Sequence, residues 1–447
     1  YEIKSDSNLV IVQNGAVSSE QIKLLKKGGS AVDAAIAAEL CIGVINSHSA
    51  GVGGGGFILI RDSNGTSQAI DFRETAPGAS TKLMYKNNPL LSQVGGLSVG
   101  VPFGKLKWET LFEPSIVLSK RGFKVPPELA KRLKEYKQEI ESNPDLSAIY
   151  APYGTILNEG DIVKNYKLAR TLKLLSKFGS EVFYNGKIAQ SIVKKVRATN
   201  GIITSKDLKD YQPIVTKPIT GFFNGRKIIT TPAPSGGPIL LAMLNILERY
   251  RLSTEDYAAL IQQNISDVSN KDHGTTHISV VDKNNQSVSL TSTVNIKWGS
   301  QVMDPDTGIL LNDEMDDFST PGVSNYFGLK PSPYNYIAPN KRPLSSCVPV
   351  IIEKDGEFEM AIGGSGGTRI LKAIENPRIH HQLLPNEVSM EYGYPNFLIP
   401  ELLQRGHEIK LFNLTVGLSG VHAVVKQQNQ TIFAAGDFRK HGVASGY

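Results

Sequence analysis

Cysteine is almost absent from this chain of 447 residues, which has only Cys41 and Cys347. Two cysteines cannot build a disulfide framework or a four-cysteine zinc site. Both lie in apolar surroundings in the sequence. Since a free cysteine in such surroundings behaves as a small hydrophobic residue, we expect two buried, inert thiols.

Long hydrophobic runs are lacking too. A membrane-spanning helix needs ~18 or more consecutive apolar residues. The best stretch, residues 31–45, is interrupted by Asp33 and Glu39. No signal peptide is recognisable, and the chain starts with Tyr1 rather than Met, so we expect that an upstream targeting or anchoring segment has been left out.

A strong excess of one charge is also missing. Lys and Arg number 48 against 42 Asp and Glu, which gives a net charge of +6. The basic residues are scattered with acids nearby, a pattern typical of a solvated face rather than of a nucleic-acid-binding stripe. The 40% hydrophobic share is near the globular norm, and this length allows two or three domains or one large unit. We therefore expect a globular protein with no nucleic-acid partner.

The motifs of common cofactors and metals are absent or out of context. There is no G-x-x-x-x-G-K-[ST] phosphate loop. Gly51-x-Gly53-x-x-Gly56 matches the dinucleotide fingerprint, but it follows a predicted helix and precedes a predicted strand, which is the reverse of the required order. His380-His381 has no nearby third ligand. We expect a tight backbone turn at the glycines, no metal and no cofactor.

The pattern of the chain mixes helices with antiparallel strands. Between about residues 114 and 248 the sequence is predicted to be mostly helical, and from Thr275 onward hydrophobic residues alternate with a period of two. Helices are expected over residues 18–27, 31–45, 129–141, 168–177, 188–196 and 239–249. Strands are expected over residues 10–12, 57–60, 348–353, 358–362, 422–426 and 431–434, with a hairpin around 282–286. This pattern favours an α+β fold with helices packed on antiparallel sheets.

One candidate nucleophile is Ser365, in Gly363-x-Ser365-x-Gly367. This is the pattern of a nucleophile elbow, and a predicted strand precedes it. The segment that follows is too short, and too soon interrupted by Pro377, for the long helix that an elbow opens. Consecutive glycines also let backbone N–H groups approach a ligand closely, as an oxyanion hole requires.

The other candidate nucleophile is Thr275, at the start of the hairpin. A turn centred on Asn284 places Thr275 opposite Thr293, so that two hydroxyl groups meet at one end of the sheet. Asn295 follows on the same face, and further on come an acidic loop, small hydroxyl residues and paired glycines. Arg73 adds a permanent cation that can grip a carboxylate with two hydrogen bonds.

At these residues the sequence resembles the γ-glutamyltransferase (glutathione hydrolase) family of N-terminal-nucleophile hydrolases. The resemblance runs over most of the chain. Any one matching stretch would be weak evidence for the family, but so many matches in the same order are specific to it. They comprise residues 29–35, 53–57, 71–77, 234–237, 275–281, 312–318, 343–346, 366–369, 377–382 and 436–442.

The resemblance implies a four-layer αββα sandwich, a single structural domain over residues 1–447. It also implies a precursor that cleaves itself between Gly274 and Thr275. The products would be a large subunit (1–274) and a small subunit (275–447), which remain together as a heterodimer. Family habit and five N-x-S/T sequons favour the secretory route, ending at the cell surface, outside the cell or in the vacuole. The sequons are at Asn64, Asn264, Asn285, Asn413 and Asn429.

The family's site residues carry over to matching positions of this chain. Thr275 would be the nucleophile and Thr293 its hydrogen-bond partner, while Gly366 and Gly367 would form the oxyanion hole. Three residues would hold the α-carboxylate of the substrate: Arg73, Ser345 and Ser346. Three would hold its α-ammonium: Asn295, Glu314 and Asp317.

The implied activity is hydrolysis of γ-glutamyl amides such as glutathione, or transfer of the γ-glutamyl group to amino acids or dipeptides. It would proceed through an ester on Thr275, with the freed α-amino group of that residue as the base. A related acylase, a serine hydrolase using Ser365 and a non-catalytic relative remain as alternatives. The chain departs from the family in three abbreviated segments: after residues 101–102, between 251 and 273, and between 369 and 377.

Overall fold

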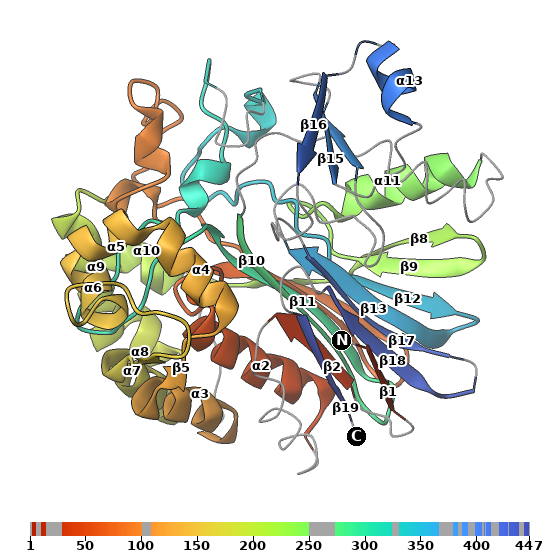
Figure 1. Cartoon of the computed structure of the whole chain (residues 1–447), viewed down its shortest axis with the longest axis horizontal. Coiled ribbons are helices and arrows are strands. Elements are labelled where there is room, and N and C mark those ends of the chain that lie inside the picture. The colour runs from red at the N-terminus through yellow and green to blue at the C-terminus, as the bar shows by residue number, and fades with distance from the viewer. Residues whose placement is uncertain are drawn as a thin grey trace.

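The computed structural model describes residues 2–5, 10–14, 29–100, 109–249, 273–323, 330–365, 379–382, 387–391, 398–404, 406, 408–412, 420–427, 429–437 and 442–446. Two seven-stranded sheets lie face to face at the centre (Figure 1). The first sheet has the order β19 (Gly442–Gly446), β2 (Val10–Asn14), β10 (His273–Val281), β11 (Ser287–Ile296), β3 (Gly55–Arg61), β4 (Ser67–Asp71) and β7 (Ile214–Thr216). The second has the order β1 (Glu2–Ser5), β18 (Ile432–Gly436), β17 (Gly420–Lys426), β13 (Glu357–Ser365), β12 (Val350–Lys354), β9 (Arg226–Thr230) and β8 (Ile219–Phe223).

Helices cover both outer sides of this pair of sheets (Figure 1). On the side of the first sheet lie α2 (Ala31–Ile45), α3 (Glu109–Arg121), α4 (Pro127–Glu135), α5 (Lys137–Ser142), α6 (Pro144–Tyr150), α7 (Tyr166–Phe178), α8 (Glu181–Tyr184), α9 (Lys187–Ala198) and α10 (Ser205–Asp210). On the side of the second lie α11 (Gly237–Glu248), α13 (Leu398–Gln404) and a small sheet of β14 (Ile379–Gln382), β15 (Glu387–Glu391) and β16 (Glu408–Phe412). Two short strands, β5 (Phe123–Lys124) and β6 (Ile162–Val163), pair beside α3.

Separate hydrophobic clusters hold the layers together. Ala34, Ala38 and Ile42 of α2 pack against Ile278 and Leu290 of the first sheet. A second cluster fills the space between the two sheets, and a third joins the outer face of the second sheet to α11. The fold is therefore the predicted α+β sandwich with four layers in the order αββα.

Helix α2 begins and ends where the sequence predicts, and its beginning has a local cause. Ser30 caps the helix, because its hydroxyl accepts a hydrogen bond from the Asp33 N–H at 3.3 Å and the Asp33 carboxylate accepts one from the Ser30 N–H at 2.9 Å. This capping box satisfies two backbone donors that the helix leaves unpaired. The glycine-rich turn follows α2 and leads into β3, in the order that argues against a dinucleotide site.

Two predictions of secondary structure are wrong in detail. The predicted helix 129–141 is two helices, α4 and α5, separated at Tyr136, whose ψ of 29° departs from helical geometry. The predicted helical middle also contains β7, β8 and β9. Asn224 and Gly225 have φ values of 48° and 73°, which is the conformation of a two-residue hairpin turn between β8 and β9. The predicted helix 18–27 lies outside the described residues.

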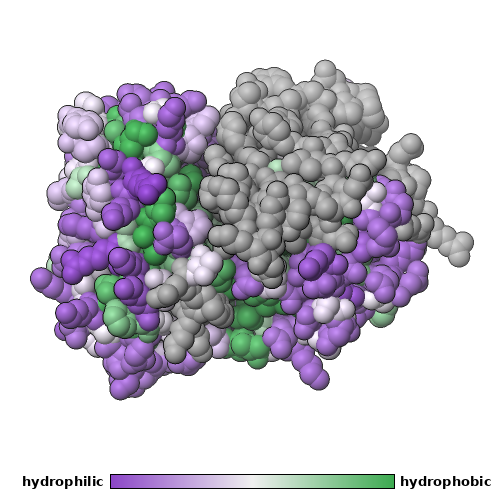
Figure 2. Space-filling model, turned by 90° about the horizontal axis from the view of Figure 1, so that it is seen from below, coloured by the Kyte–Doolittle hydropathy of each residue, from purple (hydrophilic) through white to green (hydrophobic). Residues whose placement is uncertain are grey.

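The cysteines and the lengths of the helices can be compared with the predictions from the sequence. Neither Cys41 nor Cys347 forms a disulfide, and both are buried, which confirms that part of the prediction. Among the described residues, no helix is long and apolar enough to cross a membrane. In the coloured part of the face shown in Figure 2, hydrophilic side chains dominate, and apolar side chains gather in a band near its middle.

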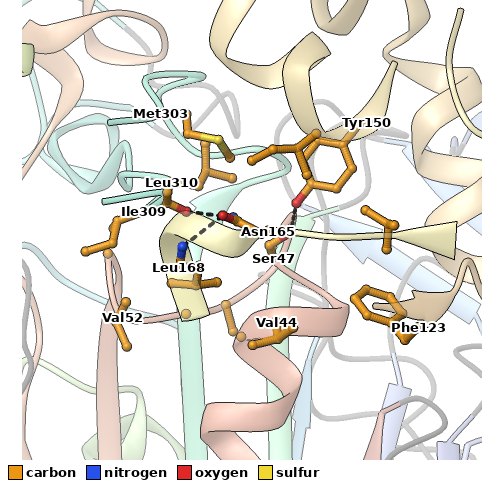
Figure 3. A pocket seen from close by; sticks show the side chains of 17 residues that line it. Val44, Ser47, Val52, Phe123, Tyr150, Asn165, Leu168, Met303, Ile309 and Leu310 are labelled. Carbon is orange, nitrogen blue, oxygen red and sulfur yellow. Dashed lines mark hydrogen bonds between the residues drawn. The ribbon is translucent and has the colours of Figure 1, made fainter. Parts of the chain in front are cut away.

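A small cavity lies where α2 ends and the glycine-rich turn begins (Figure 3). The Ser47 hydroxyl and the Tyr150 hydroxyl are 2.5 Å apart, and the Asn165 amide donates to the Gly308 carbonyl at 3.0 Å. The cavity has a volume of about 20 Å³, which is enough for about one water molecule. This cavity is therefore too small for a substrate. Its hydrogen bonds connect the segment after α2 to the end of α6, and the start of α7 to Gly308.

Candidate active site

The candidate nucleophile lies at the paired end of β10 and β11. Thr275 is opposite Thr293 in the register of the two strands, as the hairpin pattern predicts. A shift in register between Gly274 and Thr275 marks a bulge next to this pair. Ile278 and Leu290 face α2, and alternation along the strands therefore turns both threonines toward the second sheet. Thr275 is 5% exposed, so the hydroxyl pair is nearly shielded from solvent.

A short chain of hydrogen bonds connects this pair to the preceding peptide bond. The Asn295 N–H donates to the Thr293 hydroxyl at 2.8 Å, and the Thr293 hydroxyl donates to the Gly274 carbonyl. The two threonine hydroxyl oxygens are 3.2 Å apart. A hydroxyl group has one proton to donate, and that of Thr293 goes to Gly274. Thr275 is therefore the donor in the hydroxyl pair, and Thr293 polarises the carbonyl beside the candidate nucleophile.

Gly274 is required by its surroundings. A Cβ atom at this position would lie 2.8 Å from the carbonyl oxygen of His48 and 3.1 Å from that of Ile296. Both contacts are with backbone atoms, which cannot rotate away as a side chain can. A larger residue would therefore displace the peptide bond that precedes Thr275.

Arg73 forms the centre of a second part of the site. It follows β4, is 1% exposed, and makes ion pairs with Glu314 and Asp317 of the 3₁₀ helix η3 (Glu314–Asp317). Its guanidinium also donates to the Leu344 carbonyl at 3.0 Å. Arg73 is therefore not a surface residue, and its sequence neighbour Asp71 pairs instead with Arg342 at 3.4 Å.

The electrostatics of this cluster are dominated by burial. Burial alone would lower the pKa of Arg73, but Glu314 and Asp317 raise it above its ordinary value. Burial raises the pKa of both acids, although Arg73 acts in the opposite direction on each. Burial also raises the pKa of Glu74 to about 8, against the effect of Arg73. With more carboxyl groups than guanidinium groups, the cluster can hold an additional cation.

Asn295 connects the two parts of the site. Its backbone N–H donates to Thr293, while its side-chain amide donates to the Asp313 carbonyl at 3.2 Å. The Asn295 side chain also bonds to Asp317, which lowers the pKa of that carboxyl and so partly offsets the effect of burial. The structure thus brings the predicted residues Thr275, Thr293, Asn295, Arg73, Glu314 and Asp317 into one connected network.

The remaining predicted site residues fall into two groups. Ser345 and Ser346 follow the backbone carbonyls of residues 343 and 344 that contact Arg73. Ser345 is half-buried, and its hydroxyl accepts from the Cys347 N–H at 3.1 Å, while Ser346 is exposed. Gly366 and Gly367 lie outside the described residues.

Ser365, the alternative nucleophile, is the last residue of β13. It is 0% exposed and pairs with Gly420 of β17 in the register of the second sheet. A nucleophile elbow instead presents its serine at an exposed turn between a strand and a helix. The described geometry of Ser365 therefore does not fit the elbow.

Three further residues support the site and were missed as site residues by the sequence analysis: Glu74, Asn312 and Asp313. The Asn312 amide nitrogen donates to the Gly53 carbonyl at 2.7 Å and to the Gly100 carbonyl at 3.1 Å. Its oxygen accepts from the N–H groups of Gly100 and Glu314, each at 3.0 Å. Asn312 thus fixes η3 to the glycine-rich turn. Glu74 and Asn312 both fall within the matched stretches of the sequence, but only the fold shows their partners.

Comparison with known proteins gives a consistent assignment. A sequence profile described as Gamma-glutamyltranspeptidase matches residues 18–266, 258–374 and 370–447. Glutathione hydrolase proenzyme 1 of Schizosaccharomyces pombe is 39% identical over 547 aligned positions, which cover 100% of this chain and 87% of that relative. The gamma-glutamyltranspeptidase of Helicobacter pylori superposes with a TM-score of 0.51 at 32% identity, over 56% of this chain and 80% of that one.

The fold itself is shared more widely. A cephalosporin acylase from Bacillus halodurans superposes with a TM-score of 0.84 over 100% of this chain and 97% of that one, at 19% identity. At that identity the likeness describes the fold alone.

The alignment with the Schizosaccharomyces relative also shows that this chain is shorter than the aligned length. It spans 547 positions, to which this chain contributes 447 residues, so about 100 positions face a gap. The three profile matches join near residues 258–266 and 370–374. Both junctions lie within segments that the sequence analysis identifies as abbreviated.

We expect Asn312→Ala to lower the free energy of unfolding by ~2–5 kcal/mol, because four hydrogen bonds are lost and their backbone partners stay buried. Urea unfolding of the variant and the wild type measures this difference. Asn165→Ala is the matched control, since the Asn165 side chain makes two comparable bonds within the described part of the chain, to Gly308 and Leu168. A loss no larger than that of the control would contradict the role assigned to Asn312.

Proposed function

Because the chain belongs to the gamma-glutamyltranspeptidase family, we propose that Thr275 is the nucleophile with which it acts on γ-glutamyl compounds. The protein is a γ-glutamyltransferase and glutathione hydrolase, an enzyme that hydrolyses γ-glutamyl amides and transfers the γ-glutamyl group. The observation that carries the assignment of Thr275 is its contact with Thr293, whose own proton is donated to the Gly274 carbonyl.

The first reaction of Thr275 is on its own chain. Its hydroxyl oxygen attacks the Gly274 carbonyl carbon, the bond from that carbon to the Thr275 nitrogen breaks, and the hydroxyl proton passes to the nitrogen. The result is an ester between Gly274 and the Thr275 side chain. Water then hydrolyses the ester and leaves a carboxylate on Gly274 and a free α-amino group on Thr275. Thr293 assists because a donor on the carbonyl oxygen stabilises the negative charge that develops there.

The second reaction uses the same hydroxyl on a substrate. The freed α-amino group takes the Thr275 proton, since its ordinary pKa of ~7.7–8.0 suits a base near neutral pH. The hydroxyl oxygen attacks the γ-carbonyl carbon, and the leaving amine receives the proton. Water, an amino acid or a dipeptide then takes the γ-glutamyl group from the ester. Gly366 and Gly367 supply the N–H donors for the oxyanion in this proposal.

Recognition of the γ-glutamyl group uses its two charges. Arg73, Ser345 and Ser346 bind the α-carboxylate, and Asn295, Glu314 and Asp317 bind the α-ammonium. In the described structure Arg73 is paired with two of these acids. A zwitterionic substrate can exchange with that pair, because its carboxylate takes a place at Arg73 while its ammonium compensates the released acid. The two-fragment form is supported by the word proenzyme in the name of the Schizosaccharomyces relative.

We also propose that the protein follows the secretory route and is glycosylated. The sequon residues Asn64 and Asn429 are exposed, and each lies in a turn between two strands. Asn285 is half-buried and accepts a hydrogen bond from Lys426 at 2.7 Å. The sequons at Asn264 and Asn413 lie outside the described residues.

Thr275→Ala should remain a single chain, because no hydroxyl is left to attack Gly274, and Thr275→Ser should still cleave, but slowly. Denaturing electrophoresis and N-terminal sequencing of the fragment 275–447 test this. Thr276→Ala is the matched control, since Thr276 is equally buried but points to the other face of the strand. Recovery of Thr275→Ala in two pieces would refute self-processing.

Arg73→Lys should reduce kcat/KM for a γ-glutamyl anilide ~10- to 150-fold, which corresponds to the ~1.5–3 kcal/mol of a charge-assisted hydrogen bond. Lysine keeps the charge but loses the planar fork that binds a carboxylate. Asp317→Ala should be impaired similarly through the α-ammonium. For both variants and the wild type, kcat/KM is also to be measured with an acyl anilide that lacks the α-amino and carboxyl groups.

Arg226→Lys provides the control for this experiment, because Arg226 also grips a carboxylate with two bonds, to Glu359 at 2.6 and 2.9 Å, but on the second sheet away from the site. Its kcat/KM should equal that of the wild type. Should Arg73→Lys and Asp317→Ala keep wild-type rates, or the plain acyl anilide be cleaved equally well, the recognition model is wrong and the broader acylase reading replaces it.

A further inference from the structure

A large cavity lies on the face of the first sheet that is turned away from Thr275. Its volume is about 330 Å³, and α2, α7 and the strands β3 and β11 form most of its walls. The lining is predominantly aliphatic and includes Ile36, Leu40, Ile58, Ile60, Leu172 and Leu290. A volume of this order is within the range of small-molecule sites in proteins, ~300–1,000 Å³.

One acid stands out in this apolar lining. Glu39 of α2 is the only titratable group among the described residues that line the cavity. Its Oε2 atom is shielded from solvent and has no hydrogen-bond partner among the described residues. The Ser292 hydroxyl bonds to the carboxyl group, and burial raises the pKa of Glu39 to about 7 in spite of that bond. A carboxyl group in such surroundings is costly unless a partner compensates it.

We propose that this cavity is a binding site for a small apolar molecule with one amino group, such as an alkylamine. The ammonium group fills the open position at Glu39 Oε2 and neutralises the carboxylate, and the hydrocarbon part covers the aliphatic walls. An alkane or alcohol of the same length fits the walls but leaves the shielded Oε2 of the carboxylate without a counter-charge. An alkanoate places a second negative charge beside the first.

This site differs from the proposed γ-glutamyl site in both position and chemistry. Ser292 neighbours Thr293 in β11, but successive side chains of a strand point to opposite faces, so the sheet separates the cavity from the nucleophile. The γ-glutamyl group carries a carboxylate as well as an ammonium, and no cationic side chain lines the cavity among the described residues. The cavity therefore suits a monocation and not the zwitterionic substrate.

Isothermal titration with octylamine, octanol and octanoate, without any γ-glutamyl donor, tests the proposal. At pH 8 we expect octylamine to bind with a stoichiometry of one, at least tenfold more tightly than octanol. Octanoate should bind most weakly. Lowering the pH from 8 to 6 should weaken octylamine binding, because Glu39 becomes protonated while an alkylamine with a pKa near ~10.4 stays charged. Octanol binding should change little over the same range.

Glu39→Gln keeps the shape of the side chain but removes its charge. It should weaken octylamine binding ~10- to 150-fold, the range of one charge-assisted hydrogen bond, and leave octanol binding and kcat/KM for a γ-glutamyl anilide unchanged. Intact catalysis together with lost amine binding separates this proposal from the assignment of Thr275. Equal binding of octylamine and octanol, undiminished octylamine binding by Glu39→Gln, or no saturable binding of octylamine to the wild type would each overturn it.

Discussion

The buried guanidinium of Arg73 is the constraint around which the site is arranged. A charge removed from water is costly unless it is paired and its remaining donors are satisfied. Here the partners come from the 3₁₀ helix η3 and from the backbone of residues 343–344, which are distant from Arg73 in sequence. Satisfying one side chain therefore fixes three segments relative to one another. Asn295 then connects the same cluster to the threonine pair, through its bonds to Asp317 and to the Thr293 hydroxyl.

This arrangement leaves the cluster with carboxyl groups that can bind a cationic ligand. The cluster has more acids than it has cations, and burial raises the pKa of Glu74, Glu314 and Asp317. Protons therefore stabilise the empty site, and an ammonium group can take over that role. A substrate that carries both charges on one carbon brings no net charge of its own into the cluster. A plain acyl group has neither charge to offer.

How far the sequence predicts this structure depends on the range of the interactions. The register of Thr275 with Thr293 follows from alternation and from the position of one turn, and the start of α2 follows from Ser30 and Asp33. The hairpin at Asn224-Gly225 was missed because a short turn was read within a largely helical stretch. The burial of Arg73, the bonds of Asn312 and the cavity beside Glu39 depend on how remote segments pack, which no local pattern contains. The assignments of Gly366 and Gly367 stay predictions.

The interleaving of the strands has a consequence for the two fragments that the proposed cleavage at Gly274 would produce. The first sheet pairs β10 and β19 with β2, and β11 with β3, while the second pairs β1 with β18 and β9 with β12. Each of these ladders joins a strand before Gly274 to one that lies largely or wholly after it. Breaking the backbone there removes one covalent link and leaves every ladder in place. Separating the two fragments would require both sheets to come apart at once. The two fragments would therefore unfold together in one cooperative transition, and they would not exchange between molecules.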